Sequence, residues 1–261
     1  MLKTRLIPVL LLQNGLLVRS ELFNQHQVIG NPIHEVERFN HWSVDELIYL
    51  DISRDDNYDM RRDDAKIKNS GNALDIIESV SNSCFMPLTW GGRIRSIENM
   101  RSFFARGADK VAINTIAWHR PEIIEQAAKK FGSQAIVVSI DVKTFENGNS
   151  EVFVDGGREA TGITPVAWAR EIESRGAGEL LIQSINRDGT GRGYDLNMIE
   201  QMSAATSIPI IACSGVGRFE DYAKGIKAGA SAVAAANIWH FKEMADRNGK
   251  RAMRRAGINV R

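Results

Sequence analysis

The amino-acid sequence predicts an α/β fold, a single (β/α)8 TIM barrel that spans residues 1–261. Three observations support this prediction. The chain has 261 residues, and one such barrel usually needs about 250. Short apolar runs alternate with segments of helical spacing along the whole chain. Similar segments also recur about half a chain apart, which predicts a two-fold repeat of half-barrels.

Eight apolar runs are candidate strands. They are continuous rather than alternating, as expected for parallel strands that are buried on both faces. The runs cover residues 6–12, 46–51, 86–90, 110–113, 135–140, 179–183, 208–212 and 232–235. Helical spacing fills the segments between them, for example residues 33–39, 97–106, 121–131 and 165–175.

The internal repeat involves two pairs of segments. ELIYLDISRD at 46–55 resembles ELLIQSINRD at 179–188, and GADKVA at 107–112 resembles GASAVA at 229–234. Chance similarity among buried strands is the alternative explanation. In each pair the later copy lies about half a chain downstream, which favours two half-barrels.

Charge and cysteine content narrow the class of protein. Lys and Arg total 33 against 32 for Asp and Glu, which argues against nucleic acid or a membrane surface as the partner. Two cysteines, Cys84 and Cys213, do not make a disulfide framework and favour a cytoplasmic location. The apolar start of the chain contains Pro8 and leads into a turn at 13–15, so we expect a buried strand rather than a signal peptide or membrane span.

One segment, residues 54–71, interrupts the alternation because it is highly charged and nearly free of large aliphatic side chains. We expect it to form a solvated loop after the second strand, on the catalytic face of the barrel. It is either a simple insertion or a lid or partner-binding loop.

Glycine-rich turns follow the third and seventh strands, and a small polar step follows the fourth and eighth. Glycine allows close approach of the backbone, and a helix N-terminus offers free N–H groups to an anion. The repeat predicts two phosphate sites for the two ends of one ligand, although tight turns alone would explain the glycines. The residues concerned are Gly91, Gly92, Asn114, Thr115, Gly215 and Asn237.

Four charged residues lie at the starts of otherwise apolar strands: Arg5, Glu46, Lys110 and Glu179. Buried charges are costly unless they are paired. Two acids and two bases at the amino end of the barrel predict a closed ring. On spacing alone the ring is either functional or a plain salt-bridge plug.

Asp141 ends the fifth strand, and Asp51 and Asp188 follow the second and sixth strands. A carboxylate at the carboxyl end of a barrel strand is a usual acid/base position. Helix capping or loop anchoring is the alternative for each. The five histidines lack metal-ligand spacing, so we expect no metal ion and no cofactor.

Together these motifs resemble the cyclase subunit of imidazole glycerol phosphate synthase over nearly the whole chain. They are TWGGRIR at 89–95, AINT at 112–115, SIDVK at 139–143, GAGE at 176–179, SINRDGT at 184–190 and GINVR at 257–261. The resemblance implies a glutaminase partner and a role in histidine biosynthesis. Ammonia would pass through the barrel to a phosphoribulosyl aminoimidazole substrate with two phosphates, giving imidazole glycerol phosphate and an aminoimidazole carboxamide ribotide.

The resemblance also assigns roles to individual residues. The ring of Arg5, Glu46, Lys110 and Glu179 matches the family's ammonia gate, and Asp141 matches a catalytic aspartate. Asp188 matches a second family residue, which we count among the catalytic candidates. The phosphate loops correspond to Gly91, Gly92, Asn114, Thr115, Gly189, Gly215 and Asn237.

Several positions depart from the family pattern. Leu11 stands where the family has a second catalytic aspartate on the first strand, and loss of one general acid or base typically costs about 10²–10⁴ in rate. Arg93 replaces the third glycine of a phosphate loop, Arg19 replaces a lysine, and Asn186 replaces an aspartate. The loop at 54–71 is also longer than usual.

These departures leave three hypotheses. The chain resembles diverged copies used in surface-polysaccharide (O-antigen) pathways, which supply ammonia to a third protein, an amidotransferase that makes an acetamidino group on a sugar. It would then channel ammonia with weak or no cyclase activity. The alternatives are a working cyclase of histidine biosynthesis and a non-catalytic activator or scaffold for the glutaminase.

Overall fold

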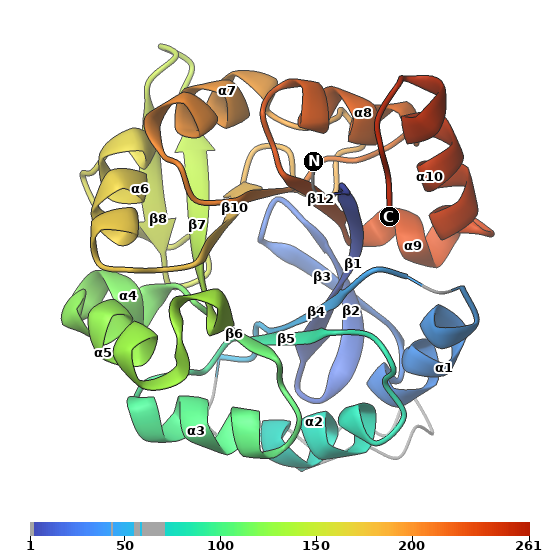
Figure 1. Ribbon diagram of the computed structural model, residues 1–261, viewed down its shortest axis with the longest axis horizontal. Helices are drawn as coiled ribbons and strands as arrows, with labels where there is room; N and C mark the ends of the chain where they lie inside the picture. Colours follow the sequence, from blue (N-terminus) through green and yellow to red (C-terminus); the bar gives the residue numbers. More distant parts are fainter. Residues whose placement is uncertain (1–2, 43, 55–57, 59–70) are drawn as a thin grey trace.

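A computed structural model describes residues 3–42, 44–54, 58 and 71–261, and in this part of the chain eight parallel strands close into a barrel (Figure 1). Neighbouring strands pair in parallel around the circle, and pairing of β7 with β10 joins the two halves. In barrel order the strands are β1 (Arg5–Gln13), β4 (Leu47–Asp51), β5 (Leu88–Gly91), β6 (Lys110–Ile113), β7 (Ile136–Thr144), β10 (Glu179–Ser184), β11 (Ile210–Cys213) and β12 (Ala232–Ala235). Each predicted strand is confirmed, with ends that differ by a few residues.

Helices form the outer layer of the barrel (Figure 1). The predicted helical segments correspond to α1, α3, α5 and α6. The longer helices are α1 (Pro32–Trp42), α2 (Ala73–Ser81), α3 (Ile97–Ala105), α5 (Glu122–Phe131), α6 (Pro165–Ser174), α7 (Leu196–Ala205), α8 (Glu220–Lys227) and α10 (Ala245–Arg255). Short helices α4 (Thr115–His119) and α9 (Asn237–Phe241) follow β6 and β12, and a 3-10 turn, η1 (Ser133–Ala135), precedes β7.

Two apolar layers explain why the strands are continuous hydrophobic runs. Side chains alternate between the two faces of a strand. On β1, Leu6, Leu10 and Leu12 pack outward against the helices, whereas Ile7 and Val9 belong to the cluster inside the barrel. Both faces are therefore buried, as the sequence predicted.

The repeated segments occupy equivalent places in the two halves. ELIYLDISRD and ELLIQSINRD contribute β4 and β10, the second and sixth strands of the barrel. GADKVA and GASAVA lead into β6 and β12, the fourth and eighth strands. The two-fold half-barrel repeat is thus visible in the strand order.

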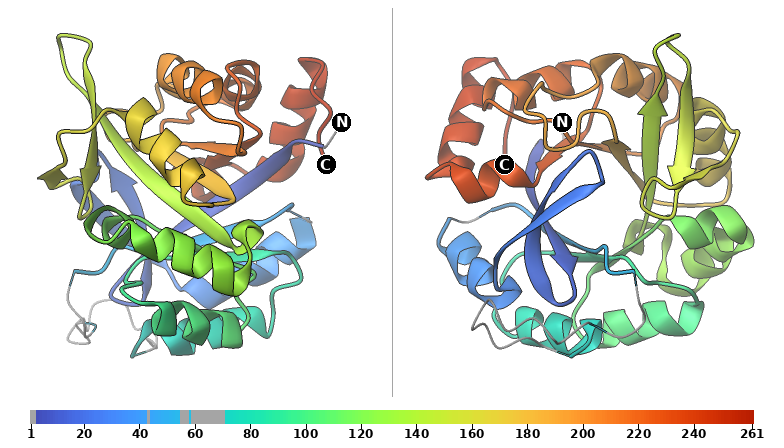
Figure 2. Two further views of the ribbon diagram at one scale, coloured as in Figure 1. Left: turned by 60° about the vertical axis from the view of Figure 1, so that its left-hand side comes forward. Right: turned by 180° about the vertical axis from the view of Figure 1, so that it is seen from behind.

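Two antiparallel extensions at the carboxyl end of the barrel were not predicted. After β1 the chain forms a hairpin of β2 (Leu16–Glu21) and β3 (Gln25–Gly30), which lies across the barrel in the reverse view (Figure 2). Asn14 and Gly15 have φ of 49° and 76°, the left-handed conformations that tight hairpin turns require. After β7, the short strands β8 (Ser150–Val154) and β9 (Glu159–Ala160) continue the sheet.

Most of the charged segment 54–71 lies outside the described residues, apart from Arg54, Tyr58 and Gly71. In the described part of the chain, no helix combines the length and apolar character that crossing a membrane requires.

Candidate functional site

A cavity of about 540 Å³ opens at the carboxyl end of the barrel strands, the end where barrel enzymes place their active sites. The ends of the strands line its floor. The β2–β3 hairpin and the turn between β8 and β9 contribute to its wall. The predicted catalytic residues Asp141 and Asp188 both line this one cavity.

Asp141 lies on β7 and is buried, with 4% of its surface exposed. Its carboxylate accepts hydrogen bonds from Asn114 Nδ2 at 2.9 Å and Gln183 Nε2 at 3.1 Å. Burial raises the pKa of Asp141 from 3.8 to about 7, although these hydrogen bonds oppose the shift. A carboxyl group that titrates near neutrality can both take and give a proton, which suits general acid/base chemistry.

Asp188 follows β10 and is held by the hairpin after β1. Ser20 Oγ donates to its carboxylate at 2.6 Å, and the Phe23 N–H donates at 3.2 Å. Burial raises the pKa of Asp188, and the two hydrogen bonds oppose that shift. The unpredicted hairpin therefore positions a predicted site residue.

Leu11 lines the cavity from β1 and is 8% exposed. It pairs in register with Leu50 of β4 and packs in the apolar cluster inside the barrel. The position where the motif resemblance implies a second catalytic carboxylate therefore presents an apolar side chain to the same cavity as Asp141.

Most predicted phosphate-loop residues surround the cavity in two groups. Gly92, Asn114 and Thr115 line the side formed by β5 and β6. Across the barrel, the lining includes Gly189, Gly215 and Asn237.

Gly91 does not line this cavity. A Cβ there would come within 2.6 Å of Leu50 Cδ2 and 3.0 Å of Ala112 Cβ, so packing of neighbouring strands explains this glycine.

Two of the lining glycines are required by the backbone itself. Gly92 has φ of 89°, and a Cβ there would overlap the carbonyl oxygen of Asp51. Gly215 has φ of 91°, and a Cβ there would overlap the carbonyl oxygen of Gly193. The turns are therefore tight, and anion binding by their N–H groups stays a prediction.

Arg93 occupies an unusual position in the cavity wall. Its φ of 58° lies in the left-handed region, which costs a non-glycine residue about 1–2 kcal/mol. Its guanidinium lies 5.6 Å from the centre of the Tyr58 ring, and its Nε lies 4.0 Å from Asp51 Oδ2. The Tyr58 hydroxyl donates to the same carboxylate oxygen at 2.7 Å. These contacts offset the backbone strain, and they join the cation to the wall.

The other two departures do not enter the cavity lining. Arg19 Nε donates to Gln27 Oε1 across the β2–β3 hairpin at 2.8 Å. Asn186 Oδ1 accepts from the Thr144 N–H at 2.8 Å and so joins the ends of β7 and β10.

At the amino end of the barrel, the four predicted charges form a closed ring. Arg5 Nη1 donates to both carboxylate oxygens of Glu46 at 2.9 Å, and Arg5 Nη2 pairs with Glu179. Lys110 Nζ lies 2.9 Å from Glu179 Oε2 and 3.5 Å from Glu46 Oε2. Burial lowers the pKa of Arg5, but Glu179 and Glu46 outweigh it and hold the pKa above its ordinary value.

The ring and the cavity are the two ends of the same inward-facing rows of side chains. Side chains two apart on a strand share one face. Three rows connect the two ends: Glu46, just before β4, with Ile48 and Leu50 on it; Lys110 and Ala112 on β6, with Asn114 just after it; and Glu179, Leu181 and Gln183 on β10. Four residues of strand separate the ends by about 13 Å, and the layer between them is apolar.

Comparison with known proteins shows the family of the chain. A family model described as "Histidine biosynthesis protein" matches residues 5–245. The chain is 38% identical over all 261 residues to imidazole glycerol phosphate synthase subunit HisF of Gluconacetobacter diazotrophicus, covering 97% of that protein. The chain belongs to the histidine biosynthesis protein family. The family resemblance drawn from the motifs is thus confirmed, and the chain is a HisF-like barrel.

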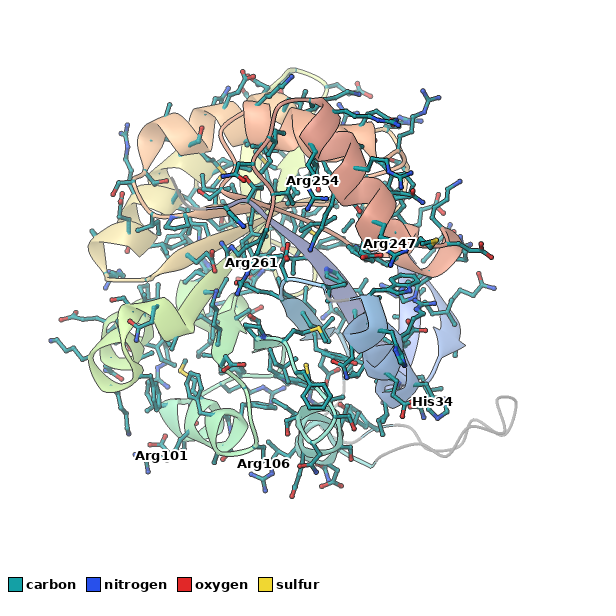
Figure 3. All side chains as sticks on the ribbon, turned by 45° about the vertical axis from the view of Figure 1, so that its right-hand side comes forward. His34, Arg101, Arg106, Arg247, Arg254 and Arg261 are labelled. Atoms are coloured by element: carbon teal, nitrogen blue, oxygen red, sulfur yellow. The ribbon has the colours of Figure 1, made fainter. Side chains whose placement is uncertain are left out.

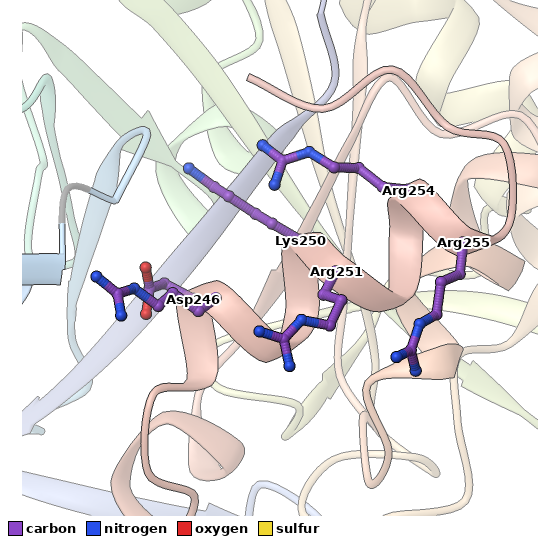
Figure 4. A pocket seen from close by; sticks show the side chains of 6 residues that line it. Asp246, Lys250, Arg251, Arg254 and Arg255 are labelled. Atoms are coloured by element: carbon purple, nitrogen blue, oxygen red, sulfur yellow. The ribbon is translucent and has the colours of Figure 1, made fainter.

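Helix α10 carries a basic surface on the outside of the barrel. The helix carries five basic residues in eleven positions. Lys250 is paired, because its Nζ lies 2.7 Å from Asp45 Oδ1, next to the ring residue Glu46. The exposed members are Arg247, Arg251, Arg254 and Arg255. Figure 3 marks Arg247 and Arg254 along the helix, and Figure 4 shows Arg251 and Arg255 extending away from Lys250 and Arg254.

The raised pKa of Asp141 predicts a pH-dependent stability. The folded-state pKa lies above the ordinary value, so the contribution to stability is present at low pH and is lost as pH rises through about 7. Asp141→Asn cannot titrate. Between about pH 4 and 8, the free energy of unfolding of this variant should therefore rise relative to that of the wild type by up to about 4 kcal/mol. The difference in melting temperature should rise with it. Thermal melts across this range check it, and a constant difference would contradict it.

The ring predicts that loss of one cation is costly. Lys110→Met leaves Glu46 and Glu179 with Arg5 alone and should lower the free energy of unfolding by about 1–3 kcal/mol. Lys129→Met is the matched control, because Lys129 pairs with Glu125 on the exposed surface and should change stability by less than about 1 kcal/mol. Urea denaturation measures both. Equal effects would mean that the ring adds no more than a surface pair.

Proposed function

We propose that this chain is the barrel subunit of a glutamine amidotransferase, which receives ammonia from a glutaminase partner and binds a phosphorylated ligand in the cavity. The observation that supports this most directly is the pairing of two sites on the same rows of side chains. A closed ring of Arg5, Glu46, Lys110 and Glu179 lies at one end, and Asp141 lies at the other. The apolar layer between them favours passage of neutral ammonia over the ammonium ion, because burying an unpaired charge is costly.

The ring must open for a molecule to pass, and its construction suits that task. Lys110 makes one short and one longer contact, at 2.9 and 3.5 Å. Arg5 instead uses its planar fork to hold both carboxylates. Movement of the lysine, which is a point charge on a flexible stem, would break the ring at one position and leave the arginine contacts in place.

Our proposal for the chemistry follows from Leu11. The cavity retains Asp141 as a proton carrier, but Leu11 lies where the family pattern has its second acid/base. We therefore propose that ring closure is weak and that the ammonia serves another acceptor. The acceptor we favour is a sugar of a surface polysaccharide, amidated by a third protein.

A working cyclase is the second candidate, and a specific observation favours it. Asp188 lines the same cavity, its pKa is raised by burial, and its charge also raises the pKa of Asp141. It could act as the missing acid or base. The full-length similarity to a synthase subunit fits this candidate equally well.

The two candidates predict different rates with an ammonium salt and the phosphoribulosyl aminoimidazole substrate. We expect wild-type turnover to lie about 10²–10⁴ below that of an ordinary cyclase. Leu11→Asp should recover part of that loss, whereas Leu11→Asn, of similar size but unable to ionise, should not. Purified protein and complementation of a cyclase-deficient histidine auxotroph are the two measurements.

Wild-type turnover near that of an ordinary cyclase would overturn the weak-cyclase proposal and favour the role of Asp188. A third reading, a scaffold that only activates the glutaminase, has its own signature. Glutaminase turnover would be stimulated, but no amide nitrogen from labelled glutamine would reach any acceptor.

The basic surface on α10 predicts how the glutaminase binds. Because Lys250 ties α10 to Asp45 beside the ring, a partner that covers the ring would also meet Arg247 and Arg254, which lie three and four residues from Lys250 on the same face of the helix. We expect this partner to present acidic side chains there. Arg247→Glu with Arg254→Glu should weaken association about tenfold at low salt and less at high salt.

Titration calorimetry with the glutaminase at two salt concentrations is the measurement. Arg192→Glu is the matched control, since Arg192 is exposed in the loop after β10 at the opposite end of the barrel. Unchanged affinity in the α10 variant would place the partner elsewhere.

A further inference from the structure

The two halves of the cavity differ sharply in charge, although the repeat makes them similar in backbone. Four arginines line the half formed by the ends of β4, β5 and β6 and by the β8–β9 turn: Arg54, Arg93, Arg95 and Arg158. The described lining of the other half, at the ends of β10, β11 and β12, contains no lysine or arginine. A ligand with two equivalent phosphates would not require this asymmetry.

The half at β10–β12 offers neutral groups. Ser214 Oγ is buried without a hydrogen-bond partner, and it precedes Gly215 at the end of β11. Asn237 donates through Nδ2 to the Ser20 carbonyl at 2.9 Å, while its Oδ1 is buried without a partner. A hydroxyl donor beside the N–H groups of a glycine turn matches one phosphate monoester.

The half at β4–β8 is built around cations. The turn between β8 and β9 holds Arg158 in place through Asp155. Arg158 Nε donates to the Asp155 backbone carbonyl at 2.8 Å, and Arg158 Nη2 donates to the Asp155 carboxylate at 2.7 Å. The Asp155 N–H in turn donates to Thr115 Oγ1 at 3.0 Å. The threonine hydroxyl is thus left to donate its own proton to an anion. Arg158 and Thr115 therefore belong to one connected wall.

Arg93 adds a further cation to this wall, although its backbone is strained. A side chain is held there in the left-handed region, where glycine would be relaxed, and strained residues of this kind cluster at binding sites. Within the described lining of this half, four arginines face three carboxylates, Asp51, Asp141 and Asp155, which leaves a net charge of about +1 from these groups. The opposite half holds Asp188.

We propose that the ligand is asymmetric, with a phosphate monoester at the β10–β12 half and a diphosphate at the β4–β8 half. Arginine forks recognise adjacent phosphate oxygens with paired, charge-assisted hydrogen bonds, and several arginines match a diphosphate better than a single phosphate. This inference rests on the proposed function only in taking the cavity as the ligand site. It is independent of the glutaminase and of ring closure.

Isothermal titration with inorganic pyrophosphate and inorganic phosphate tests the proposal, at constant ionic strength and without divalent metal. We expect pyrophosphate to bind at least about tenfold more tightly than phosphate. Arg93→Gly with Arg95→Gln should remove that preference. Ser214→Ala should weaken phosphate binding and leave pyrophosphate binding within about twofold, because the two probes use different halves.

Arg101→Gln is the control for a general loss of positive charge, since Arg101 is exposed on α3, and it should change neither affinity. Equal affinity of the wild-type chain for the two probes would overturn the proposal without any variant. So would an equal loss of both affinities in the arginine variant. Arg93→Gly relaxes the backbone, and a melting curve for each variant verifies folding. Failure of the cyclase or glutaminase experiments would leave these outcomes unchanged.

Discussion

Closure of the sheet between β7 and β10 is the constraint on which the rest of this molecule depends. Once eight parallel strands form a circle, alternate side chains of every strand must point to one shared interior. The amino ends then bring Arg5, Glu46, Lys110 and Glu179 within contact, and the carboxyl ends bring Asp141 and Asp188 into one cavity. Charge at both ends and apolar side chains between them follow from residue spacing along the strands.

The sequence was sufficient to predict features that depend on residue type and a period of two. The strands, the charged ring and the placement of Asp141 belong to this group. It was not sufficient where a partner comes from a distant segment. Ser20 holds Asp188 across 168 residues, and nothing local to either residue signals this. Gly91 illustrates a different limit, because a glycine required for strand packing and one that lines a cavity look alike in sequence.

Arg93 shows how a substitution can change a site without disturbing its frame. The tight turn at Gly92 keeps its course against Asp51, and the new side chain is accommodated by Tyr58 and the Asp51 carboxylate. At Leu11 the opposite holds, because an apolar side chain joins the interior cluster at the position where the motif resemblance implies a proton carrier. Arg93 adds a positive charge to the cavity and Leu11 contributes none, while the barrel around both residues remains that of the family.

The charged ring also has a consequence for biosynthesis of the chain. Arg5 and Glu179 are separated by 174 residues, so the ring joins distant parts of the chain and can close only after β10 has been synthesised. A nascent first half-barrel would hold Arg5 and Lys110 against Glu46 alone, with one cation unneutralised. This unneutralised charge makes it costly to bury the open edge of the half-barrel too early. When β10 joins the sheet, Glu179 neutralises the charge. The same four side chains would therefore act first as a folding checkpoint.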